Sequence, residues 1–143
     1  MNGGLFAKGV EGLVLAAMAF VLAVCSSPTS PGLEGGMLAT FDVQGERYSI
    51  FITNPQTIEQ VLALSNGQSN ARIPSGRLIK GREAYNAPWS WHIDPEDVQM
   101  AELTMELCDG LPSYVEKDIE YWVDTVGRFC PWSAVLVALK DYR

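Results

Sequence analysis

Two short segments on either side of Gly45-Glu46 constrain the fold of this chain most strongly. Residues 38–44 and 47–53 alternate apolar and polar side chains. Alternation with a period of two is typical of a β-strand with one buried face, and two such strands joined by a short turn form an antiparallel hairpin. The sequence therefore predicts a hairpin here. The side chains expected to face the core are Phe41, Val43, Tyr48, Ile50 and Ile52.

Two later segments carry the signals of helices. The first follows Asn54-Pro55, where a proline stands near the first helical position, and Gly67 is expected to end it. The second begins at Ser113 and Glu116, which have the spacing of a capping box, and is expected to end at Gly127. Both segments have apolar residues at helical spacing, so each helix is expected to pack one face on the core.

The remaining strands are predicted from shorter patterns. Residues 66–88 are expected to form a long loop with one strand at residues 77–80. We expect three further strands, at residues 89–93, 100–108 and 132–139. Turns are expected at residues 94–97 and at Asp109-Gly110. Together these patterns predict a single small α+β domain over residues 37–143, with a mostly antiparallel sheet of about five or six strands and two helices.

The N-terminal region has the pattern of an export signal. Residues 13–25 carry no charge, and this stretch is shorter than the roughly 20 residues that a membrane-spanning helix needs. Its length is typical of the apolar region of a secretory signal. We therefore expect residues 1–25 to be a signal sequence and residues 26–36, which are rich in Ser, Pro and Gly, to be a tether.

The end of this signal leaves two alternatives for localisation. Leu22-Ala23-Val24-Cys25 is similar to a bacterial lipobox, in which the cysteine carries a lipid, although Val24 replaces the usual small residue. The exported protein is thus expected to be either freely secreted or a cell-envelope lipoprotein anchored at Cys25. A lipid at this position is the only contact with a membrane that the sequence predicts.

The cysteines agree with an oxidising compartment. Of three cysteines, Cys25 belongs to the signal or its lipid, which leaves Cys108 and Cys130 for the folded part. An even number of cysteines in an exported chain favours a disulfide between them, and two buried free thiols are the alternative. Two cysteines and one histidine do not supply the four ligands of a structural zinc site, so no metal or cofactor is expected.

The charge of the chain argues against one class of partner. Ten Lys and Arg residues stand against 17 Asp and Glu residues, which gives a net charge of −7. Binding to nucleic acid depends on clustered basic residues that release counterions from the phosphates. The sequence contains no such cluster, so we expect no nucleic-acid partner.

The densest group of chemically distinctive side chains lies in residues 86–97. On a strand, two tryptophans of this segment would share one face and the only histidine would lie on the other. Aromatic side chains supply rigid contact area, so the segment suits recognition of an extracellular protein or glycan. The predicted binding residues are Asn86, Trp89, Trp91, His92 and Asp94. In the alternative interpretation both tryptophans belong to the core and His92 is held by a hydrogen bond.

Two other functions remain open from the sequence. A secreted peptidase inhibitor would need a rigid exposed loop, for which the segment from Arg72 to Arg82 is the candidate because it holds three arginines. A hydrolase would use His92 as general base, Ser90 or a loop serine as nucleophile, and Asp94 or Asp97 to orient the imidazole. The sequence has no Gly-x-Ser-x-Gly elbow, so no catalytic residue is assigned and the chain is not expected to be an enzyme.

Residues 41–143 resemble a family of small exported domains that carry the label calmodulin-binding protein, after the N-terminal domain of one member. The strings that carry the resemblance are Thr53-Asn54-Pro55, Ile73-Pro74-x-Gly76-Arg77, Asn86-Ala87-Pro88-Trp89-Ser90-Trp91-His92, Glu106-Leu107-Cys108-Asp109-Gly110 and Phe129-Cys130-Pro131-Trp132-Ser133-Ala134. The resemblance implies an exported domain and transfers no catalytic or binding residue. Calmodulin binding is not expected, because calmodulin targets are basic amphipathic helices, whereas the second predicted helix is acidic and the first has no Lys or Arg.

Overall fold

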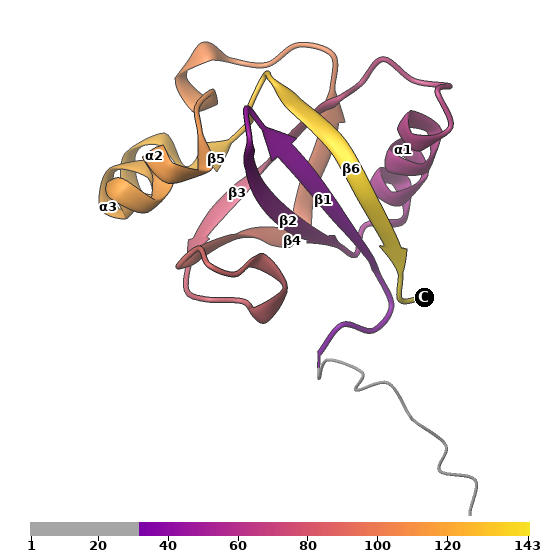
Figure 1. Ribbon diagram of the computed structural model, residues 1–143, viewed down its shortest axis with the longest axis horizontal. Helices are drawn as coiled ribbons and strands as arrows, with labels where there is room; N and C mark the ends of the chain where they lie inside the picture. Colours follow the sequence, from indigo (N-terminus) through magenta and orange to yellow (C-terminus); the bar gives the residue numbers. More distant parts are fainter. Residues whose placement is uncertain (1–31) are drawn as a thin grey trace, which may run out of the picture.

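The structure is a computed structural model that describes residues 32–143. The predicted signal sequence, the lipidation site Cys25 and residues 26–31 of the predicted tether lie outside the described residues. Within residues 32–143, no helix is long and apolar enough to cross a membrane. This part of the chain forms two three-stranded sheets with short helices on either side (Figure 1). The prediction of an α+β domain is therefore confirmed.

The predicted hairpin is present and begins the first sheet. β1 (Met37–Val43) pairs antiparallel with β2 (Glu46–Ile52). The chain reverses at Gly45, whose φ of 93° is a conformation that glycine adopts without steric cost. β6 (Ala134–Asp141) pairs with the other side of β1, so the strand order is β2-β1-β6 and β6 lies at an edge of the sheet.

The second sheet is also antiparallel. Its central strand is β3 (Ile73–Lys80), flanked by β4 (Trp91–Ala101) and the two-residue β5 (Arg128–Phe129). The register between β3 and β4 shifts next to Gly76, where the strands lie so close that a Cβ atom would overlap the side chain of Ile93. The predicted turn at residues 94–97 is therefore wrong, because these residues continue β4 through the irregularity.

The first predicted helix forms as α1 (Pro55–Ser65). The side chain of Asn54 caps it, because Oδ1 accepts hydrogen bonds from the backbone N–H groups of Gln56 and Thr57 at 2.9 and 3.3 Å. The helix is followed by Gly67, which has a φ of 71° as expected for a residue that ends a helix. The buried face of α1 is formed by Thr57, Ile58 and Val61.

The second predicted helix is present but interrupted. α2 (Pro112–Lys117) is followed by α3 (Ile119–Tyr121) and by a π-helical turn, η3 (Trp122–Val126). The interruption lies at Asp118, whose φ of −142° and ψ of 61° are not helical. The segment ends at Gly127 as predicted, where φ is 77°.

The predicted capping box at the start of α2 is wrong. The backbone N–H and hydroxyl of Ser113 donate to the carboxylate of Glu46 at 2.8 and 2.7 Å. The carboxylate of Glu116 accepts from the backbone N–H and hydroxyl of Ser90 at 2.9 and 2.8 Å. Both residues therefore tie α2 to distant segments of the chain instead of capping the helix.

The predicted strand at residues 100–108 is also wrong. β4 ends at Ala101, which pairs with Ile73, the first residue of β3. Beyond this point β4 has no strand to pair with, and the chain leaves the sheet as a loop that ends in the 3₁₀ turn η2 (Glu106–Cys108). The apolar side chains of this segment are exposed, namely Leu103, Met105 and Leu107.

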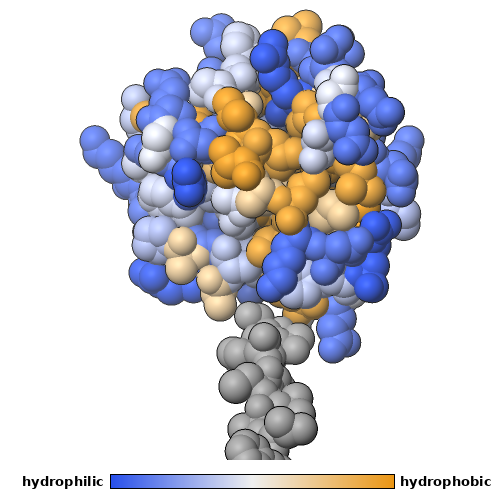
Figure 2. Space-filling view, turned by 45° about the vertical axis from the view of Figure 1, so that its right-hand side comes forward, coloured by the Kyte–Doolittle hydropathy of each residue, from blue (hydrophilic) through white to orange (hydrophobic). Residues whose placement is uncertain are grey.

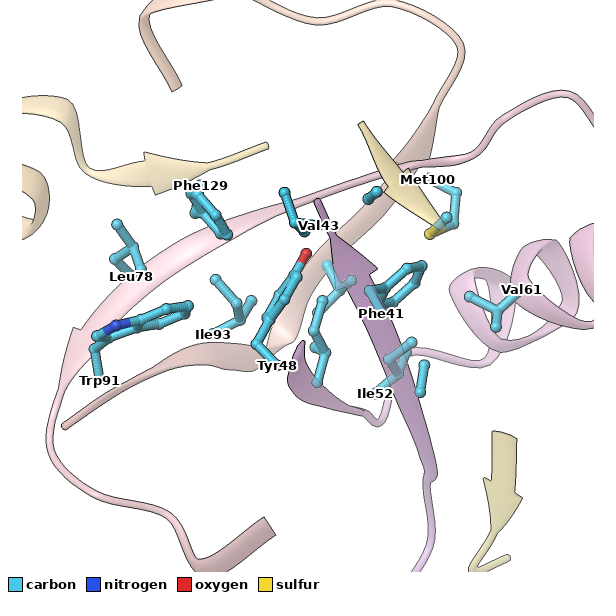
Figure 3. Close-up of a cluster of buried hydrophobic side chains, with 14 of the residues drawn as sticks. Phe41, Val43, Tyr48, Ile52, Val61, Leu78, Trp91, Ile93, Met100 and Phe129 are labelled. Carbon is cyan, nitrogen blue, oxygen red and sulfur yellow. The ribbon is translucent and has the colours of Figure 1, made fainter. Parts of the chain in front are cut away.

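The core lies between the two sheets and under α1 (Figure 3). All five side chains predicted to face the core from the hairpin are buried. Tyr48 from β2 meets Phe129 from β5 edge to face, with ring centroids 5.4 Å apart. Trp91 from β4 meets the same phenylalanine at 5.4 Å and contacts Tyr48 at 5.9 Å. These three rings join the first sheet to the second.

Cys108 and Cys130 lie at disulfide distance, as the cysteine count predicts, with Cα atoms 5.1 Å apart. The backbone N–H of Cys130 also donates to the carbonyl of Cys108 at 2.8 Å. Both cysteines are buried and pack with Ile73 and Val126 in a small cluster of their own. The pair fastens the loop after β4 to the segment between β5 and β6.

We predict that replacing both cysteines, Cys108→Ala with Cys130→Ala, lowers the free energy of unfolding by about 2–4 kcal/mol. A cross-link stabilises mainly by restricting the unfolded chain, so the loss should be seen in urea denaturation. A reducing agent should destabilise the natural chain by a similar amount and leave the double variant unchanged. Equal stability of the natural chain with and without reductant would contradict a disulfide.

Candidate functional site

The loop between β3 and β4 covers the outer edge of β2. It contains the short 3₁₀ turn η1 (Ala84–Asn86). The side chain of Asn86 is buried and accepts a hydrogen bond from the backbone N–H of Ser49 at 2.8 Å. The indole N–H of Trp89 donates to the carbonyl of Arg47, also at 2.8 Å. Two side chains of the loop thus satisfy backbone groups that an edge strand would leave unpaired.

The structure places the two tryptophans of this segment side by side. The rings of Trp89 and Trp91 are stacked with centroids 6.1 Å apart. Trp91 is completely buried in the core, whereas Trp89 is half-buried at the surface. Asn86 also donates to the carbonyl of Trp91 at 2.8 Å. Among the predicted binding residues Asn86, Trp89 and Trp91, only Trp89 has a side chain that solvent can reach.

His92 lies next to Trp91 on the opposite face of β4 and is half-buried. Its Nδ1 atom is 3.0 Å from the backbone carbonyl oxygen of Gly81. A carbonyl oxygen only accepts hydrogen bonds, so Nδ1 carries the proton and, in the neutral ring, Nε2 is left as an acceptor. The histidine is therefore held in one orientation.

A pocket of about 290 Å³ opens beside His92. Its lining combines aromatic, aliphatic and polar groups, and includes Leu33, Phe51, Glu83, Tyr85, His92 and Pro95. The rings of Phe51 and Tyr85 are tilted against each other with centroids 6.2 Å apart. Burial, followed by the negative charges of Glu83 and Asp94, raises the pKa of the Tyr85 phenol, so its hydroxyl stays protonated.

Asp94 does not line this pocket but forms a structural ion pair. Its carboxylate accepts a hydrogen bond from Nε of Arg77 at 3.1 Å, and Nη2 of the same guanidinium contacts the same oxygen. The backbone N–H of Glu96 donates to the other oxygen at 3.0 Å. Arg77 and this backbone N–H lower the pKa of the Asp94 carboxyl below its ordinary value of 3.8.

The groups of the hydrolase hypothesis are engaged separately. The hydroxyl of Ser90 donates to Glu116, His92 bonds Gly81 and Asp94 bonds Arg77. Within residues 32–143, no hydrogen bond links the serine, the histidine and the aspartate. No group of three His, Cys, Asp or Glu residues in this part of the chain could hold a metal ion.

The segment proposed as an inhibitor loop is largely a strand. Residues 73–80 form β3, the central strand of the second sheet, and Arg77 from this strand pairs with Asp94. Arg82 donates to the carbonyl of Pro88 at 3.2 Å. Arg72 lies before the strand and lines a groove beside β6. The three arginines are therefore not presented together on one exposed loop.

Sequence reasoning missed the residues that complete the pocket around His92. Phe51 is in β2, Glu83 precedes η1 and Leu33 precedes β1. These positions come together only because the loop after β3 folds over β2. Phe51 had one local signal, since it is an apolar residue at a position where the alternation of β2 predicts a polar one.

The structure thus defines a small α+β domain of two antiparallel sheets, with a cysteine pair at disulfide distance and a mixed aromatic and polar pocket. Over residues 36–142 the sequence matches the family described as the BP-74 N-terminal domain, and the chain belongs to this family. No curated protein and no solved structure matches the chain.

We predict that Asn86→Ala lowers the free energy of unfolding by about 2–4 kcal/mol, because it leaves the Ser49 N–H and the Trp91 carbonyl buried without partners. Urea denaturation measures this loss. Asn70→Ala, at an exposed position, serves as the control and should stay within about 0.5 kcal/mol of the natural chain. A similarly small effect of Asn86→Ala would contradict the role of this side chain.

We also predict a pH-dependent effect of Asp94→Asn. The pKa of Asp94 is lowered in the folded state, so its contribution is present above about pH 4 and is lost as the pH falls through the folded pKa. At pH 7 the variant should lose up to about 1 kcal/mol, since solvent screens the exposed end of Arg77. Thermal unfolding should show this difference at pH 7, and the difference should shrink as the pH falls below about 4. Glu102→Gln, at an exposed position, is the matched control.

Proposed function

We propose that this protein is an exported interaction domain that recognises an extracellular glycan through the pocket beside His92. The observation that carries the proposal is the combination of two aromatic rings, a fixed imidazole and a carboxylate around one small opening. An extracellular protein that inserts one side chain into this pocket is the alternative partner.

The chemistry of the pocket matches that of a sugar ring. A sugar presents C–H groups on its faces and hydroxyl groups around its rim. The face of Tyr85 can contact the C–H groups, because the electron-rich face of an aromatic ring attracts weakly positive hydrogens. The Glu83 carboxylate and His92 Nε2 can accept hydrogen bonds from hydroxyl groups, and the Tyr85 hydroxyl can donate one.

The size of the pocket favours a small group. A volume of about 290 Å³ lies at the lower end of the range of roughly 300–1,000 Å³ for ligand pockets. One sugar residue at the end of a glycan fits this volume better than a long chain does.

Two features support export of the domain. Residues 13–25 have the composition of a secretory signal. A buried cysteine pair at disulfide distance is typical of proteins that fold in an oxidising compartment. The same features fit a secreted protein and a cell-envelope lipoprotein lipidated at Cys25, and a glycan of the cell exterior is accessible to both.

The test is a glycan array followed by titration of the best glycan against the labelled full chain by NMR. Tyr85→Ala and His92→Ala should each weaken binding at least about tenfold, which corresponds to about 1.4 kcal/mol. Tyr85→Phe, which removes only the hydroxyl, should weaken it less. Tyr121→Ala, at an exposed tyrosine on α3, should leave binding unchanged.

Circular dichroism should show that each variant keeps its fold. Glycan binding that is insensitive to Tyr85→Ala and His92→Ala in folded variants would place the site elsewhere. Absence of any glycan ligand, together with capture of an extracellular protein that depends on His92, would establish the alternative partner.

A further inference from the structure

The two edges of the first sheet differ in whether other parts of the chain cover them. The β2 edge is covered by the side chains of Asn86 and Trp89. β6 forms the opposite edge and pairs only with β1 among the described residues. In an antiparallel pair, the N–H and C=O groups of alternate residues point away from the partner strand. The register with β1 shifts by one residue at Val137. On either side of this shift, about half of the backbone groups of β6 point away from β1 and are available to a further strand.

The open edge is also apolar. Val135 and Val137 are 59% and 44% exposed on β6, although valines of a strand are usually buried. Figure 2 turns the side of the molecule that carries β6 and α1 toward the viewer. Apolar side chains gather there in one area that is bordered by hydrophilic residues. An exposed apolar edge strand promotes aggregation, and natural proteins normally protect such edges.

A groove of about 540 Å³ runs beside this edge. One wall consists of residues 134–139, which are consecutive residues of β6. The other wall is formed by Leu64 and Ser65 at the end of α1 and by Arg72. Because consecutive residues of an extended strand line it, the groove follows the strand direction and has the length of about five or six extended residues.

The groove is lined by one charged side chain, Arg72, which forms no ion pair with any of residues 32–143. Four arginines of the described residues pair with aspartates, and these are Arg47, Arg77, Arg128 and Arg143. Arg82 donates to a backbone carbonyl. The guanidinium of Arg72 is the one with no hydrogen-bond or ion-pair partner among residues 32–143. It lines the groove beside β6, in a chain whose net charge is −7.

We propose that the β6 edge binds an extended apolar peptide of a partner protein, which adds to the first sheet as a strand and places a carboxylate against Arg72. The peptide backbone would bond the outward N–H and C=O groups of β6. Its apolar side chains would cover Val135 and Val137. Its carboxylate would form a charge-assisted hydrogen bond to the guanidinium, which a neutral amide cannot match.

A second copy of this chain fits the edge less well. Two chains that each carry a net charge of −7 repel one another, which opposes association through an edge without matched charges. This proposal does not depend on the pocket beside His92, because the two sites share no lining residue. Either site can therefore fail its test without affecting the other.

The test uses fluorescein-labelled octapeptides of Val, Ile and Thr that carry one Glu at each position in turn, with matched Gln peptides. Fluorescence anisotropy with the full chain should show that the best Glu peptide binds about three- to fivefold more tightly than its Gln counterpart. Arg72→Gln should remove this preference. Arg82→Gln, at an exposed arginine outside the groove, should retain it.

Two further measurements examine the strand geometry. N-methylation of alternate peptide amides should weaken binding about tenfold or more in only one of the two alternation phases, because only those amides bond β6. Hydrogen exchange of the outward amides in residues 135–141 should slow when the peptide binds.

Several outcomes would overturn the proposal. These are binding of no peptide in the set, equal binding of Glu and Gln peptides, and equal tolerance of N-methylation in both phases. Light scattering that shows a stable dimer, disrupted by Val137→Lys, would assign the edge to a second copy of this chain instead.

Discussion

The contact of three aromatic rings, Tyr48, Trp91 and Phe129, holds the two sheets of this domain together. Each ring comes from a different strand, and each touches the other two with centroids 5.4–5.9 Å apart. Burial of a large apolar side chain contributes about 1.5–3 kcal/mol, so this cluster supplies a substantial part of the stability of a small domain. Because neither three-stranded sheet covers its own apolar face, each depends on this contact to exclude water from the core.

The position of Trp91 also determines what its neighbours can do. Successive side chains of a strand point to opposite faces, so a tryptophan directed into the core directs His92 outward, toward the pocket that Phe51 and Tyr85 help to line. The loop that supplies Tyr85 is fastened to β2 by Asn86. One side of the first sheet is thereby closed by a loop that also builds a pocket, whereas the other side ends in β6 and remains open.

The elements that depend on neighbouring residues were predictable from the sequence. The hairpin of β1 and β2 and the start of α1 after Asn54-Pro55 are local, and both form as expected. The segment at residues 100–108 shows the limit of such reasoning. Its alternation is typical of a strand, but β3 begins opposite Ala101, so no partner is available and the segment leaves the sheet. The spacing of Ser113 and Glu116 was equally misleading, because distant partners, Glu46 and Ser90, bind these side chains.

The sequence by itself determined the first hairpin, the first helix, the mixed fold class and the pairing of Cys108 with Cys130. Periodicity sets which faces of the elements are apolar, and the part of the chain that was predicted to fold contains only two cysteines. Only the tertiary structure decided which groups reach solvent. The pocket beside His92 and the groove beside β6 each join segments that are far apart in the chain, and no local pattern records which of them meet. Burial depends on these long-range contacts, so Trp91 became part of the core while Val135 and Val137 stayed exposed.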